Sequence, residues 1–73
     1  MKILITGATG LFGSYLARKF ALQHEIFCLK RKGHGYGLLE DFQGQVHWRE
    51  GDVLDPISIE EALEEIDVVI HAA

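Results

Sequence analysis

The sequence predicts an α/β fold in which four parallel strands form one doubly wound sheet. Short apolar runs alternate with segments of helical periodicity along the 73 residues, which is typical of strands joined by right-handed crossovers. A glycine-rich turn, TGATGLFG at residues 6–13, separates the first apolar run from the first helical segment. The hydrophobic fraction of 48% is that of a globular protein, and the length suffices for one domain.

The first half of the chain predicts a strand, a helix and a second strand. Residues 2–6, KILIT, and residues 25–30, EIFCLK, are apolar runs of the length of buried strands. Residues 11–23 between them predict a helix, because apolar residues recur at a spacing of four. The apolar side of this helix is expected to consist of Phe12, Leu16, Ala17 and Phe20.

The second half predicts a loop, a strand, a helix and a fourth strand. Residues 31–44 are expected to form a loop with one helical turn, and residues 45–50, QVHWRE, alternate as a strand does. Asp55 followed by proline is typical of a helix start, and this helix is expected to end near Glu65. Residues 67–71, DVVIH, form the last apolar run.

Composition narrows the function classes. The net charge of −4 and the pI near 5.4 argue against nucleic acid or a membrane surface as partner. No apolar run approaches the roughly 18 residues of a membrane span. The single cysteine, Cys28, has apolar neighbours that predict a buried, inert thiol, and a cytoplasmic location is expected. The four histidines lack metal-ligand spacing, so we expect no metal site.

The glycine turn is suited to a phosphate. Free N–H groups at the start of a helix, together with the helix dipole, attract anions. Gly7 is expected to make the tight turn, Gly10 to leave room for a pyrophosphate, and Gly13 to let the helix approach the strand. The alternative is a strand-to-helix turn that binds no ligand.

Three motifs carry a resemblance to a known family. TGATGLFG matches the TGxxGxxG pattern of extended and atypical short-chain dehydrogenases/reductases, the group that contains nucleotide-sugar epimerases and dehydratases. GDVLD at residues 51–55 and DVVIHAA at residues 67–73 fall where that family places similar segments. The resemblance covers the whole chain. It implies a Rossmann-like three-layer fold, here partial, with four strands in the order 3-2-1-4, and binding of NAD or NADP.

The resemblance also implies a set of cofactor-binding residues. Asp52 and Val53 are expected to border the adenine, and Ala72 and Ala73 to line the ribose beside the nicotinamide. Asp52 has an alternative as a turn residue that caps local amides, and for His71 we favour packing under the end of the sheet. The residues of the glycine turn and the start of the helix that are expected to bind the cofactor are Gly7, Thr9, Gly10, Leu11, Phe12 and Gly13.

The end of the second strand bears on the choice between NAD and NADP. An acid about 20 residues after the glycine turn selects NAD, whereas a basic residue there accommodates the 2′-phosphate of NADP. That position is Lys30, followed by Arg31 and Lys32, and no acid occurs from residue 26 to 39. Lys30 and Arg31 therefore predict NADP, with NAD as the alternative. A solvated strand end is the other interpretation of these charges.

Two further patterns are set aside. GHGYG at residues 33–37 is interpreted as a flexible flap beside the adenosine, with Tyr36 exposed. Tyr15 and Lys19 spell YxxxK, the family's catalytic motif, but they occur on the first helix instead of a later one. We therefore expect no catalytic residue in this chain.

The chain is thus expected to be the N-terminal portion of a dinucleotide-binding domain, residues 1–73, with the substrate portion absent. The parent would be an epimerase, dehydratase or reductase acting on a nucleotide sugar or a small carbonyl compound. The alternatives are a non-catalytic NADP-binding redox sensor and a structural αβ fragment without ligand. An exposed fourth strand is expected to favour a homodimer.

Overall fold

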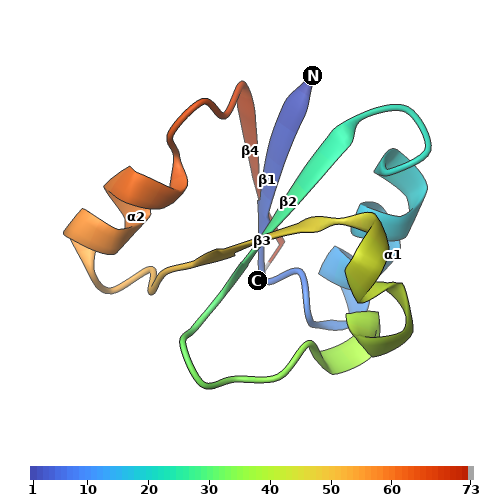
Figure 1. Cartoon of the computed structure of the whole chain (residues 1–73), viewed down its shortest axis with the longest axis horizontal. Coiled ribbons are helices and arrows are strands. Elements are labelled where there is room, and N and C mark those ends of the chain that lie inside the picture. The colour runs from blue at the N-terminus through green and yellow to red at the C-terminus, as the bar shows by residue number, and fades with distance from the viewer. Residues whose placement is uncertain (73) are drawn as a thin grey trace.

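The computed structural model describes residues 1–72 and contains one four-stranded parallel sheet (Figure 1). The strand order is β3-β2-β1-β4, as the sequence predicted. The elements are β1 (Lys2–Thr6), α1 (Leu11–Phe20), β2 (Glu25–Lys30), the 3-10 helix η1 (Gly37–Gln45), β3 (His47–Glu50), α2 (Pro56–Ala62) and β4 (Val68–His71). No helix among the described residues is long and apolar enough to cross a membrane.

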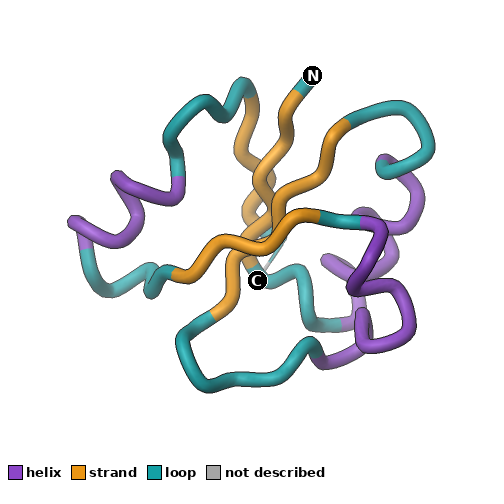
Figure 2. Tube along the Cα trace, viewed as in Figure 1, coloured by secondary structure: helices purple, strands orange, loops and turns teal. Residues whose placement is uncertain are grey.

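Helices cover both faces of the sheet, which gives three layers. Figures 1 and 2 show α1 and η1 on one side of the strands and α2 on the other. Alternate strand residues follow this division because successive side chains of a strand point to opposite faces. The core on the α1 side includes Ile3, Ile5, Ile26, Cys28, Ala17 and Leu39. The core on the α2 side includes Leu4, Phe27, Leu29 and Ala62.

The parallel register gathers the carboxyl ends of the strands at one edge of the sheet. Thr6 of β1 pairs with His71 of β4, and Lys30 of β2 pairs with Glu50 of β3. The chain crosses from β1 to β2 on one side and returns to place β4 on the other side of β1. In such sheets the crevice at this reversal is where ligands bind.

Both helices are shorter than the sequence predicted. α1 ends at Phe20, whose carbonyl accepts a hydrogen bond of 2.9 Å from His24 N–H as the chain turns back toward β2. α2 ends at Ala62, and Glu65 adopts a positive φ of 64°. The Arg49 side chain donates to the Ala62 carbonyl at 3.1 Å. A local turn thus follows the end of α1, and a contact with β3 lies at the end of α2.

Two local predictions were wrong. Phe12, expected on the buried side of α1, is 61% exposed, because the buried face of the helix is formed by Gly13, Ser14 and Ala17 and Phe12 lies off that face. The expected single helical turn before β3 is the nine-residue helix η1, which buries Leu39. Because η1 continues to Gln45, β3 begins at His47 instead of residue 45.

Candidate functional site

The glycine turn after β1 has the geometry that the sequence predicted for two of its glycines. Gly7 adopts a positive φ of 72°, and its carbonyl accepts the Gly10 N–H at 3.2 Å. A Cβ on Gly13 would collide with the Gly7 carbonyl and lie 2.8 Å from the Cα of Ala8. The absence of a side chain at Gly13 therefore lets α1 pack directly against the turn.

The start of α1 fits an anion. Gly10 is the N-cap residue, and no side chain caps the helix there. The N–H groups of the first turn lack intrahelical acceptors, so they are available to a ligand. A Cβ on Gly10 would meet only the Gly7 carbonyl, at 3.5 Å, and would otherwise project into open space. The free donors and the open space together fit the pyrophosphate of a dinucleotide.

A cavity of about 250 Å³ lies at the carboxyl edge of the sheet, beside this turn. It joins the glycine turn to the ends of β2, β3 and β4, which are distant in sequence. Six residues predicted for the cofactor line it: Gly7, Thr9, Lys30, Arg31, Asp52 and Val53. The other lining residues are Thr6, Leu29, His34, Gly35, Gly51 and His71.

The remaining predicted residues lie outside the lining of this cavity. Gly10 and Gly13 belong to the turn beside it, and Leu11 is 82% exposed at the start of α1. Ala72 packs against the core, and its N–H donates to the Thr6 carbonyl at 3.0 Å. Ala73 lies outside the described residues.

Asp52 organises the turn that follows β3. Its carboxylate accepts the Leu54 N–H at 2.9 Å, and its own N–H donates to the Ser58 hydroxyl at 3.0 Å. The interpretation of Asp52 as a turn residue is thus confirmed. The residue also lines the cavity, so its contact with adenine stays a prediction.

The two cations after β2 have different surroundings. The ammonium of Lys30 donates to the His34 carbonyl at 2.7 Å and lies 5.4 Å from the centre of the Tyr36 ring. Arg31 is exposed and lines both this cavity and a neighbouring one of about 360 Å³. Lys32 lines only the neighbouring cavity. The structure therefore separates residues that the sequence grouped together.

The segment at residues 33–37, which we interpreted as a flexible flap, lines the cavity at His34 and Gly35 and meets the glycine turn at Gly37. Leu38 N–H donates to the Thr9 carbonyl at 3.1 Å, and the rings of Tyr36 and Trp48 lie 4.8 Å apart. Tyr36 is consequently half-buried, not exposed. Gly37 has a positive φ of 55°, and a Cβ there would lie 2.6 Å from the Thr9 carbonyl. The sequence did not predict this role of Gly37, because the glycines at residues 33–37 were interpreted only as part of a loop.

His71 also departs from its expected place. The side chain is exposed, not packed under the sheet, and it lines the cavity. Its Nδ1 is hydrogen-bonded to the hydroxyl of Thr6, its register partner on β1. The pair occupies the crevice between β1 and β4, where the strand order reverses.

Neither a reactive thiol nor a metal-binding group of side chains is found among the described residues. Burial raises the pKa of the Cys28 thiol to about 12, which keeps it protonated and unreactive. Within residues 1–72, no three His, Cys, Asp or Glu side chains are grouped so that they could hold a metal ion.

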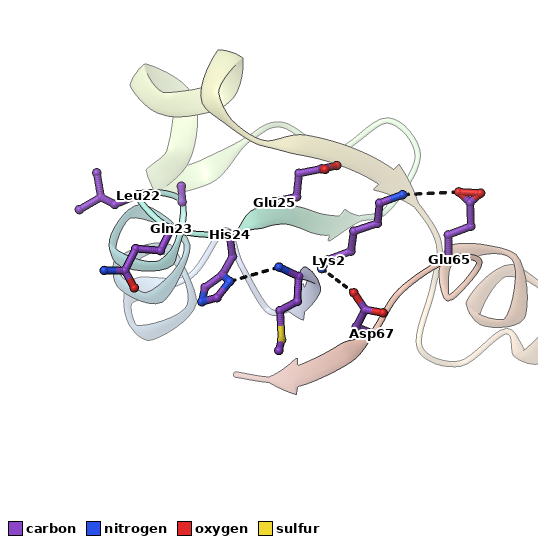
Figure 3. Close-up of a pocket in the computed structure, with 9 residues that line it drawn as sticks. Lys2, Leu22, Gln23, His24, Glu25, Glu65 and Asp67 are labelled. Carbon is purple, nitrogen blue, oxygen red and sulfur yellow. Dashed lines mark hydrogen bonds and ion pairs between the residues drawn. The ribbon is translucent and has the colours of Figure 1, made fainter.

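A larger hollow of about 650 Å³ lies at the opposite edge, at the amino ends of β1 and β2 (Figure 3). Lys2 makes two polar contacts in this hollow. The Lys2 N–H donates to the Asp67 carboxylate at 2.8 Å, and the Lys2 ammonium lies 3.5 Å from the Glu65 carboxylate. Parallel sheets bind ligands at the carboxyl ends of their strands. This hollow is therefore not a candidate for the dinucleotide site, despite its size.

Comparison with protein families gives one match that covers almost the whole chain. Residues 3–73 match the model of the NAD dependent epimerase/dehydratase family. The chain belongs to this family. Membership in a family described as NAD dependent implies a nicotinamide dinucleotide as the cofactor. A comparison with curated proteins found no match.

Solved structures support the same assignment of fold to this family member. A nucleoside-diphosphate-sugar epimerase from Pseudomonas aeruginosa matches with a TM-score of 0.84 and 27% identity, over 99% of this chain and 24% of that one. A serine dehydrogenase from Escherichia coli matches with a TM-score of 0.71 and 27% identity, over 94% and 36%. Vestitone reductase from alfalfa, Medicago sativa, shares the fold, with a TM-score of 0.79 and 22% identity over 99% and 24%.

These structures are much longer than the family member described here. The chain spans about a quarter of the length of the epimerase and of vestitone reductase. What these structures share with this chain is therefore the Rossmann-like fold of its strands and helices.

Proposed function

We propose that this chain binds the adenosine and pyrophosphate portion of a nicotinamide dinucleotide at the carboxyl edge of its sheet. The observation that carries the proposal is the 250 Å³ cavity, which joins the glycine turn to the ends of β2, β3 and β4. A turn that merely linked β1 to α1 would not need open space in front of an uncapped helix start.

Different residues are proposed to bind different portions of the cofactor. The N–H groups at the start of α1 hold the pyrophosphate, and Asp52 with Val53 borders the adenine. Ala72 is proposed to contact the nicotinamide ribose, and so is Ala73, which is outside the described residues. When bound, the nicotinamide supplies hydride donor and acceptor chemistry, and this chain binds and orients it. The residues proposed to bind the cofactor at the glycine turn and the start of α1 are Gly7, Thr9, Gly10, Leu11, Phe12 and Gly13.

NADP is the proposed cofactor, in preference to NAD. Arg31 is exposed at the rim of the cavity, where its guanidinium can form charge-assisted hydrogen bonds with a 2′-phosphate. No Asp or Glu occurs between residues 26 and 39 to accept hydrogen bonds from an unmodified ribose.

The substrate-binding portion is proposed to lie outside residues 1–73. The full protein would be an epimerase, dehydratase or reductase acting on a nucleotide sugar or a small carbonyl compound. The name of the Pseudomonas epimerase supports a sugar nucleotide. This chain alone is expected to bind cofactor and to catalyse no reaction.

Calorimetric or NMR titration of the 73-residue chain tests the proposal, with 5′-AMP and 2′,5′-ADP as ligands that differ only in the 2′-phosphate. We expect both to bind and 2′,5′-ADP to bind more tightly. Arg31→Met should weaken 2′,5′-ADP by about ten-fold, the effect of one charge-assisted hydrogen bond, and leave 5′-AMP unchanged. Equal affinity for both ligands would contradict the preference for NADP and would favour NAD as the cofactor. Absence of binding by a folded chain would refute the site.

Self-association is proposed through β4. This edge strand exposes 39% of Val68 and 46% of Val69, and within residues 1–72 no strand pairs with its outer side. We expect sedimentation to show a concentration-dependent dimer and Val69→Lys to abolish it. A monomer at the highest attainable concentration would contradict the proposal.

A further inference from the structure

The side chain of Lys30 is turned toward the loop that follows it. Its ammonium donates to the His34 carbonyl at 2.7 Å and lies over the Tyr36 ring, 5.4 Å from the ring centre. The same tyrosine packs on Trp48 of β3. One cation thus contacts the loop at two points and links it to the sheet.

The loop is also fixed at its two ends. At the first end, the His34 N–H donates to the Arg31 carbonyl at 3.0 Å, in a turn that contains Gly33 with a φ of 82°. At the second end, Leu38 N–H donates to the Thr9 carbonyl at 3.1 Å. The segment therefore bridges the end of β2 and the glycine turn, which are the ribose and pyrophosphate sides of the proposed site.

Between these two ends, Lys30 provides the side-chain contacts that span the loop. The neighbouring cations do not share this role: Arg31 and Lys32 are exposed, and the structure records no hydrogen bond from either side chain within residues 1–72. The Lys30 ammonium gives one of its three N–H donors to the His34 carbonyl, and its place over the Tyr36 ring directs the charged group toward the loop.

We propose that Lys30 is a positioning residue that holds the Arg31–Leu38 loop against the glycine turn, and that Arg31 alone discriminates the ribose 2′-phosphate. The inference rests on the proposed function, which supplies the ligand. The sequence predicted that Lys30 and Arg31 both select NADP, and the inference leaves that role to Arg31. Its consequence is that Lys30 acts on every adenosine ligand alike, because it shapes the cavity wall instead of touching the phosphate.

Four variants of the 73-residue chain test this: Lys30→Met, Lys30→Arg, Arg31→Met and, as the matched control for charge, Lys32→Met. Each is titrated with 5′-AMP and 2′,5′-ADP, and amide hydrogen exchange is measured without ligand. Lys30→Met should weaken both ligands by the same factor, about five-fold, through loss of one hydrogen bond. Lys30→Arg should restore most of the affinity, and Lys32→Met should change it less than about two-fold.

Hydrogen exchange in the free chain supplies a readout that needs no ligand. Lys30→Met should accelerate exchange of the His34 and Leu38 amides by about ten-fold, whereas Lys32→Met should leave both rates unchanged. Unchanged exchange in Lys30→Met would overturn the inference. So would a loss confined to 2′,5′-ADP, because it would make Lys30 a direct phosphate ligand.

The two proposals fail in different ways. If the folded wild-type chain bound neither ligand, the proposed function would be refuted. Exchange at His34 and Leu38 would then decide the role of Lys30 by itself: faster exchange in Lys30→Met would support its hold on the loop, and unchanged exchange would refute it.

Discussion

Replacing Gly13 by alanine tests the close approach of α1 to the glycine turn. The added methyl would collide with the Gly7 carbonyl oxygen and lie 2.7 Å from the Gly7 carbonyl carbon and 2.8 Å from the Ala8 Cα. All three are backbone atoms, so no side-chain rotation can relieve the collision. The helix or the turn has to move as a unit.

The magnitude follows from two opposing terms. Overpacking costs about 1–3 kcal/mol, and the backbone contacts place Gly13→Ala near the upper end. Alanine has a better helix propensity than glycine, which stabilises the folded state by about 1 kcal/mol. The net destabilisation is therefore about 2 kcal/mol. For a domain of this size, that lowers Tm by about 8–16 °C.

Thermal unfolding followed by circular dichroism measures this effect. The matched control is Gly44→Ala, because a Cβ on Gly44 meets nothing within 4 Å and the residue has no positive φ. We expect this control to unfold within about 3 °C of the wild type, as surface substitutions do. If Gly13→Ala behaved like its control, the close packing of α1 on the turn would be refuted.

Three further predictions concern positions away from the cavity. Arg18 donates to the Asp41 carboxylate, at 2.6 Å for the shortest bond, and lowers its pKa. The resulting stabilisation is present above the ordinary aspartate pKa and is lost as pH falls through the lowered value, so Arg18→Met should flatten the acid side of a Tm–pH profile. Cys28, with its pKa raised to about 12 by burial, should react with a thiol reagent at pH 8 only after denaturation; rapid labelling of folded protein would contradict its burial. Asp55 accepts the Ile57 N–H at the start of α2; Asp55→Ala should cost about 1 kcal/mol, measured by urea denaturation, with Asp55→Ser close to wild type.

The sequence predicted the positions of the strands because that information is local, whereas the order of the strands followed from the family resemblance. KILIT and EIFCLK are apolar throughout, as a strand covered on both faces requires. The end of α2 was predicted less well because it lies against a partner on another element. Arg49 of β3 donates to the Ala62 carbonyl at the end of α2, and no pattern within the helix indicates this contact.

The site divides in the same way. Gly7 and Gly13 could be assigned because their roles arise within seven residues of one turn. The orientation of the Lys30 side chain could not be predicted in this way. The number of residues after the glycine turn locates its Cα, but the position of its ammonium depends on contacts with His34 and Tyr36. His71 was misplaced for a similar reason, since its partner Thr6 is 65 residues away.

The contacts around Thr9 indicate why this turn is suited to bind without rearrangement. Gly13 lets α1 pack against the turn at Gly7, and Gly37 lets η1 approach the Thr9 carbonyl, which accepts the Leu38 N–H. The turn is therefore held by α1 on one side and by η1 on the other. A side chain at Gly13 or at Gly37 would push the neighbouring backbone away. Ordering a loop weakens binding by the entropy that it removes. A turn already held from both sides avoids most of that loss, so the donors at the start of α1 can meet a phosphate in the geometry they have without it.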